Sequence, residues 1–171
     1  TRKLANYARH DRLAHEIFDL NSLLEAEVET LRRPFLEQSV RIELELPPGP
    51  SPMSGVSFLV REAIKQLLNT SREGVILEGP GWIRATLTRE SGALMLCIAD
   101  SSGGGPPSER TFEPVYAAPE MAGGDGLALT IVKGIVKDHG GKLHVVQEDE
   151  GAVYTVRFSE AQQLKDTTTR L

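Results

Sequence analysis

The chain has 171 residues, of which 40% are hydrophobic and 25% are charged, with a formal net charge of −5. This balance is typical of one globular domain and argues against nucleic acid or an anionic membrane surface as the partner. The single cysteine, Cys97, excludes an internal disulfide and a cysteine-rich metal site, and no apolar run approaches the roughly 20 residues of a membrane-spanning helix. Because the chain begins with Thr1 rather than Met, we expect a fragment of a longer protein.

The first half of the chain reads as helices separated by a strand. Residues 1–17 carry apolar side chains at a rough helical spacing, and we expect the end of a helix there. A second helix is predicted over 20–38, with Pro34 as a kink or a late break. Apolar and charged residues alternate over 40–46, which predicts a half-buried strand. The third predicted helix covers 57–72.

The second half reads as two hairpins around a loop and one helix. The residues between 101 and 125 are rich in Gly, Pro and Ser and predict a loop. A helix follows over 127–139, with Leu127, Ile131, Ile135 and Val136 directed inward. The predicted strands are 82–88, 93–99, 142–147 and 152–158. This order predicts a two-layer α/β sandwich in which three helices cover one face of a mixed sheet of about five strands.

The segment Gly124-Asp125-Gly126-Leu127 is a glycine-rich turn that leads directly into the last predicted helix. Such a turn presents free backbone N–H groups and the positive end of the helix dipole, which suits a phosphate chain. An ordinary turn is the alternative, and the segment alone does not decide between them.

Several motifs in a fixed order resemble the ATP-binding domain of sensor histidine kinases. They are Asn69, the box that begins at Asp100, Phe112-Glu113-Pro114, Gly124–Leu127 and His139-Gly140-Gly141. The resemblance implies the Bergerat ATP-binding fold, which gyrase, Hsp90 and MutL ATPases share. It also implies a division of the chain into the end of a dimerisation and phosphoacceptor helix (1–17), the ATP-binding domain (18–160) and a disordered tail (161–171).

The resemblance implies a role for each motif residue. Asp100 would accept a hydrogen bond from the adenine amino group, Asn69 would bind Mg²⁺, and Arg72 would lie near the phosphates. Lys65 occupies the place of a second family Asn and could contact phosphate directly. The ATP-binding residues implied in this way are Lys65, Asn69, Arg72, Asp100, Gly104, Phe112, Gly124, Gly126 and Leu127, and the metal ligand is Asn69.

Four residues depart from the family pattern at positions that would face the nucleotide, namely Lys65, Ser102, Asp125 and Ala128. Two functions therefore stay open. The first is a catalytic domain that transfers the γ-phosphoryl group of ATP to a histidine outside this chain. The second is a pseudokinase-like docking module that has lost ATP binding. A serine kinase of the anti-sigma type would share the fold, but Phe112-Glu113-Pro114 favours the histidine kinase branch.

The acceptor histidine is not expected within this chain. His15-Glu16-Ile17 resembles the start of a phosphoacceptor motif, but the residues that follow differ, so we expect a solvated helix histidine. The expected partners are the dimerisation and phosphoacceptor domain of the same protein and a response regulator. The resemblance further implies a homodimeric parent protein and a cytoplasmic location for this part of it.

Overall fold

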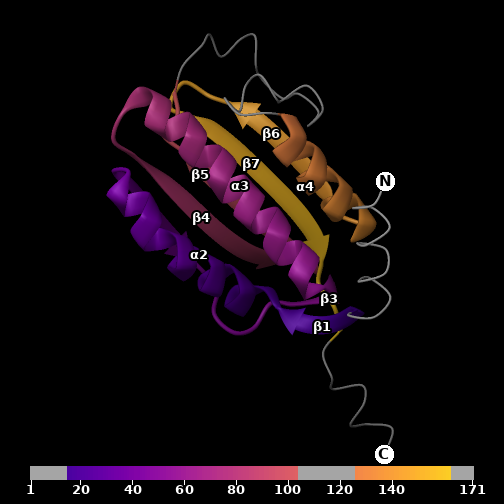
Figure 1. Cartoon of the computed structure of the whole chain (residues 1–171). Helices are drawn as coiled ribbons and strands as arrows, with labels where there is room; N and C mark the ends of the chain where they lie inside the picture. Colours follow the sequence, from indigo (N-terminus) through magenta and orange to yellow (C-terminus); the bar gives the residue numbers. More distant parts are fainter. Residues whose placement is uncertain (1–14, 104–125, 163–171) are drawn as a thin grey trace, which may run out of the picture.

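Five strands form a mixed sheet in the order β2-β4-β5-β7-β6 (Figure 1). The computed structural model describes residues 15–103 and 126–162. Strands β2 and β4 are parallel, and the other neighbouring pairs are antiparallel. The strands of this sheet are β2 (Val40–Glu45), β4 (Gly81–Glu90), β5 (Ala93–Asp100), β6 (Lys142–Gln147) and β7 (Ala152–Ser159). The predicted mixed sheet is confirmed.

Three helices lie on one face of this sheet, with α3 between α2 and α4 (Figure 1). They are α2 (Leu20–Glu37), α3 (Ser57–Glu78) and α4 (Gly126–Asp138). The core fills the space between the two layers: Ile64 and Leu67 of α3 and Leu96 and Ile98 of β5 are buried. Each such side chain contributes about 1.5–3 kcal/mol by leaving water, so this layer holds the helices in place. The predicted sandwich is confirmed.

Two short strands form a second sheet that the sequence did not predict. Strand β1 (His15–Asp19) pairs antiparallel with β3 (Pro52–Val56), and His15 lies opposite Val56. The prediction of a helix over residues 15–17 is therefore wrong. The partner strand lies far along the chain, so no local spacing could reveal it. Pro52 begins β3, the strand position that a residue without a backbone N–H tolerates.

Asp19 joins β1 to α2 and to the loop before β3. Its Oδ1 accepts hydrogen bonds from the backbone N–H groups of Asn21, at 3.0 Å, and of Ser51, at 2.8 Å. The first bond caps α2. Helix α2 continues through Pro34 without a break and ends at Glu37, one residue before the predicted end.

The other two helices differ from the prediction in length and orientation. Helix α3 continues past Arg72 to Glu78, where Gly79 ends it with a φ of 113°. In α4 the prediction of an inward Leu127 is wrong, because Leu127 is 59% exposed while Leu129 is buried. Apolar residues surround most of α4, so their spacing alone does not fix its inward face. In the described residues, no helix is both long and apolar enough to cross a membrane.

Candidate functional site

Asp100 is the last residue of β5 and is 2% exposed, on the side of the sheet that faces the helices. Its Oδ1 accepts two backbone hydrogen bonds, from Ser102 at 2.9 Å and from Ala152 at 3.0 Å. Its Oδ2 is also buried, yet no group among the described residues donates to it. A buried carboxylate oxygen without a donor is costly. This oxygen is therefore suited to receive a donor from a ligand.

The backbone around Asp100 is held at close quarters. A Cβ at Gly151 would lie 1.6 Å from the carbonyl oxygen of Asp100, so only glycine fits there. The Oγ of Ser101 accepts the backbone N–H of Trp82 at 2.9 Å, which ties the end of β5 to β4. The backbone of Ser102 does not have a positive φ, whereas Gly103 has a φ of 27°. The departure at Ser102 therefore carries no backbone strain.

Tyr154 of β7 connects Asp100 to α3. Burial raises the pKa of its phenol far above the ordinary tyrosine value, and the negative charges of Asp100 and Glu73 raise it further. Both carboxylates therefore lie close enough to act on one buried phenol. Glu73 belongs to α3, so the Asp100 side of the sheet faces the C-terminal half of this helix.

Asn69 and Arg72 lie on another side of α3. Both border a groove of about 430 Å³ with residues of α2, including Phe35 and Gln38. The Nη1 of Arg72 donates to Oε1 of Gln38 at 3.1 Å, and its guanidinium lies 5.7 Å from the centre of the Phe35 ring. The structure therefore directs these two predicted site residues toward α2.

Gln66, Thr70 and Glu73 form the side of α3 away from α2. Successive helical residues are about 100° apart, so Thr70 lies about 200° round the helix from Arg72. Gln66 and Glu73 stand four residues before and three residues after Thr70, which places all three on one side. Thr70 is 3% exposed. Lys65 and Asn69, to which the resemblance gave the two Asn positions of the family, are four residues apart. Gln66 and Thr70 have the same spacing and lie one position later in the helix.

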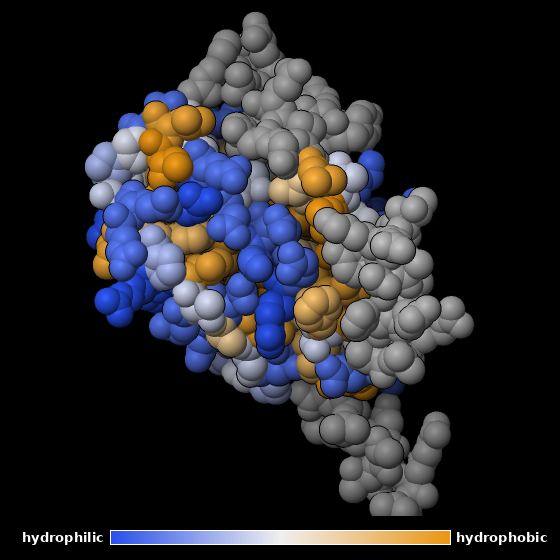
Figure 2. Space-filling view, viewed as in Figure 1, coloured by the Kyte–Doolittle hydropathy of each residue, from blue (hydrophilic) through white to orange (hydrophobic). Residues whose placement is uncertain are grey.

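The remaining predicted residues lie at the start of α4 or outside the described residues. Gly126 begins α4, and the side chain of Leu127 is exposed. Two further exposed apolar side chains, Ile76 and Leu77, lie at the end of α3, where Figure 2 shows a hydrophobic patch. Gly104, Phe112 and Gly124 lie outside the described residues, as does Asp125.

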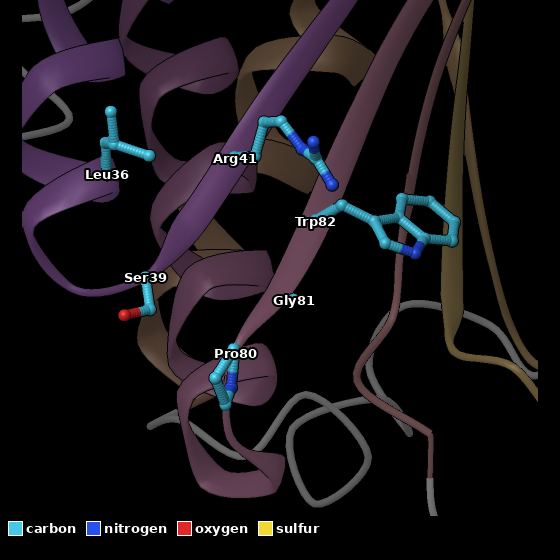
Figure 3. A pocket seen from close by; sticks show the side chains of 6 residues that line it. All are labelled: Leu36, Ser39, Arg41, Pro80, Gly81 and Trp82. Carbon is cyan, nitrogen blue, oxygen red and sulfur yellow. The ribbon is translucent and has the colours of Figure 1, made fainter.

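A separate cavity of about 370 Å³ lies at the start of β2 and β4 (Figure 3). Arg41 and Trp82 are register partners on these neighbouring strands and line the cavity with Leu36 and Pro80. No predicted ATP-binding residue lines it. The cavity is therefore distinct from the Asp100 site.

Comparison with known proteins identifies the family. Residues 54–162 match the family model described as histidine kinase-, DNA gyrase B-, and HSP90-like ATPase, which is more than half of the chain. The two-component sensor PprA of Pseudomonas aeruginosa is 26% identical over 91% of this chain. The match covers 18% of PprA, so the chain spans about a fifth of the length of this relative.

Solved structures of histidine kinases share the fold. The mycobacterial sensor histidine kinase MprB is 25% identical, with a TM-score of 0.69 over 87% of this chain and 99% of that chain. Histidine kinase ThkA, solved in complex with the response regulator protein TrrA, is 17% identical, with a TM-score of 0.67 over 86% of this chain and 42% of that chain. The chain therefore belongs to the histidine kinase-, DNA gyrase B- and HSP90-like ATPase family, and its fold is that of histidine kinase catalytic domains.

Proposed function

We propose that this chain is the ATP-binding catalytic domain of a two-component sensor histidine kinase. It transfers the γ-phosphoryl group of ATP to a histidine that lies outside the chain. The observation that carries this proposal is the buried Oδ2 of Asp100, to which no group among the described residues donates a hydrogen bond. Asp100 ends the middle strand of the sheet, within the segment that matches the ATPase family. The exocyclic amino group of adenine supplies such a donor. A guanine presents a carbonyl at the same position, so the carboxylate favours ATP over GTP.

The phosphates and their Mg²⁺ ion are assigned to α3 and the start of α4. Mg²⁺ prefers oxygen ligands and keeps several waters, so one or two protein oxygens are enough. Gln66 and Thr70 supply an amide and a hydroxyl oxygen on the Asp100 side of α3. The Nε2 of Gln66 donates to Oε1 of Glu62 at 2.8 Å, which leaves the amide oxygen as the ligand atom. We assign to these two residues the metal-ligand role that the resemblance implied for Asn69.

The chemistry of the bound ion is to neutralise charge on the phosphates, and the chain contributes position and electrostatics. No group of three or more His, Cys, Asp or Glu able to hold a metal occurs in the described ranges. Gly126 opens α4, whose first backbone N–H groups complement phosphate charge.

The partners and surroundings follow from the same proposal. The phosphoryl acceptor belongs to a dimerisation and phosphoacceptor domain of the same protein, and a homodimer brings the two domains together. A response regulator receives the phosphoryl group next. We place the start of the ATP-binding domain at His15 rather than at residue 18, because β1 pairs with β3 of the domain, and its end at 160. We place its working location in the cytoplasm. The support for the regulator is the ThkA structure, which contains one.

Calorimetric titration with ATP and with GTP, each with and without Mg²⁺, tests the proposal. We expect saturable binding of ATP with a Kd below about 1 mM, tighter with Mg²⁺, and weaker binding of GTP. Absence of ATP binding at several-fold higher concentration would instead support the docking module that has lost its nucleotide.

Two pairs of variants test the assignment on α3. Gln66→Ala and Thr70→Ala remove oxygens from the Asp100 side, and we expect them to abolish the effect of Mg²⁺ on ATP affinity. Lys65→Ala and Asn69→Ala are matched controls one position earlier in the same helix, and we expect them to keep that effect. The reverse pattern would return the metal to Asn69.

A further inference from the structure

His139 follows α4 directly, and its ring packs against β3. A Cβ at Gly55 would lie 2.3 Å from Cδ2 of His139, so the ring occupies the space above this glycine. The ring of Phe158 meets it edge-on, with the two centres 6.4 Å apart. The half-buried imidazole thus packs between β3 and β7, and its contacts fix its orientation.

Both ring nitrogens of His139 contact backbone groups of fixed polarity. The N–H of Val56 donates to Nε2 at 3.0 Å, and Nδ1 lies 2.7 Å from the carbonyl oxygen of Ile135. A carbonyl only accepts, so Nδ1 must carry a hydrogen, and an amide N–H only donates, so Nε2 must be bare. Only the neutral ring protonated at Nδ1 makes both bonds. An added proton on Nε2 would point at the N–H of Val56 and break that bond.

β1 places one acidic residue on the face of β3 that meets the ring. Glu16 of β1 lies opposite Gly55, and opposite residues of an antiparallel pair project on the same face. The carboxylate of Glu16 accepts the hydroxyl of Ser57 at 2.7 Å. In the described part of the chain, the other titratable groups nearby are His15 of β1, which lies opposite Val56, and Lys137 and Asp138, which precede His139. β3 contacts the ring through the backbone at Gly55, and β7 contacts it through the side chain of Phe158. The first turn of α3 carries no acidic residue.

We propose that His139 is a proton-sensitive latch that fastens the end of α4 to the start of α3 and opens in acid. Val56 is the N-cap residue of α3, and Ile135 lies in the last turn of α4. Protonation of Nε2 removes the acceptor of the Val56 N–H and so breaks that bond. The two helices that the latch joins are those that border the Asp100 site. Its effect on nucleotide affinity rests on the proposed function, whereas the latch itself needs no nucleotide.

Nitrogen NMR of the wild-type chain tests the latch directly. The sequence has four histidines, and the His139→Gln variant identifies the signal of His139 by its loss. At about pH 8, above the range where imidazole ordinarily takes up a proton, we expect the ring to carry its hydrogen on Nδ1. We expect the Val56 amide signal to shift with the same midpoint as His139 when the pH falls. A ring protonated on Nε2 at about pH 8, or a Val56 amide indifferent to that titration, would overturn the proposal.

Urea unfolding supplies a second test. His139→Gln keeps an oxygen that can accept from Val56 but does not titrate. Between about pH 8 and about pH 5, we expect the wild-type urea midpoint to fall and the variant to lose less than half as much. His144→Gln, in β6, is the control and keeps the wild-type fall. Equal falls in wild type and His139→Gln would refute the latch.

ATP titration at both pH values separates the two proposals. If the latch and the ATP site are both present, acid weakens ATP binding severalfold in wild type and less in His139→Gln. A chain that binds no ATP at either pH refutes the proposed function, while the NMR result still decides the latch.

Discussion

The backbone N–H of Ala152 donates a hydrogen bond of 3.0 Å to Oδ1 of Asp100, which joins the end of β5 to the start of β7. The same carboxylate therefore has two separable tasks. Oδ1 holds the backbone of the site together, and Oδ2 is the oxygen directed to a ligand. A substitution that changes only one of these oxygens separates stability from affinity.

Asp100→Ala and Asp100→Asn are expected to differ in this way. The alanine leaves the N–H groups of Ser102 and Ala152 without an acceptor, which costs about 1–3 kcal/mol of unfolding free energy. The asparagine keeps one carbonyl oxygen for these donors and presents an amino group to adenine. We expect it to lower ATP affinity about tenfold or more with a smaller loss of stability. Urea unfolding and calorimetry on both variants give the two quantities, and equal ATP affinity in Asp100→Asn and wild type would contradict the adenine contact.

Gly151→Ala should be strongly destabilising because its Cβ would overlap the backbone oxygen of Asp100. A backbone atom cannot swing aside as a flexible side chain does, so we expect a cost of at least about 1–3 kcal/mol. The matched control is Gly134→Ala. Gly134 is exposed within α4 and has open space around it, so alanine there should stabilise by about 0.5–1 kcal/mol. Urea midpoints of the two variants should therefore move in opposite directions, and a shared direction would count against this geometry.

Tyr154 should make the fold sensitive to alkali. Its pKa is raised in the folded chain by burial and by Asp100 and Glu73, whereas an unfolded tyrosine ionises near pH 10. Above about pH 10 the unfolded chain therefore binds fewer protons than the folded chain, and stability falls as the pH rises. Tyr154→Phe removes this pH-dependent contribution to stability. We expect urea unfolding between about pH 9 and about pH 11 to show a smaller loss for the variant than for wild type. Equal losses would mean that Tyr154 ionises alike in both states.

The layers of the fold were predictable because their side chains repeat with the period of their element. Alternating apolar and charged residues marked β2, two hairpins around turns marked β4 with β5 and β6 with β7, and apolar spacing marked α2 and α3. The pair β1 and β3 was not predictable. Each is five residues long, and each is stabilised by the other, which lies far away in the sequence.

The site was predictable in part, for a related reason. Asp100 stood out because a carboxylate ends a buried strand and enters a glycine loop. Helix α3 was harder, since its buried face has polar residues on both flanks. Asn69 lies on the flank toward α2, and Thr70 lies on the other. Which flank meets the site depends on the order of the helices across the sheet, and this order is a property of the fold rather than of the helix.

Arg32 covers one carbonyl oxygen on the β2 edge of the sheet, and its removal provides the last prediction. β2 is an edge strand, and the Nη1 of Arg32 donates to the carbonyl oxygen of Ile42 at 2.6 Å. A free strand edge can pair with another chain, and a charged side chain that caps it prevents this. We expect Arg32→Met to lose about 0.5–1.5 kcal/mol of unfolding free energy and to self-associate as concentration rises. Arg33→Met is the control, because Arg33 is 91% exposed and contacts only Glu37, at 3.6 Å, in the described part of the chain. Sedimentation and urea unfolding of the two variants should differ. Equal behaviour would show that the edge is protected by something other than Arg32.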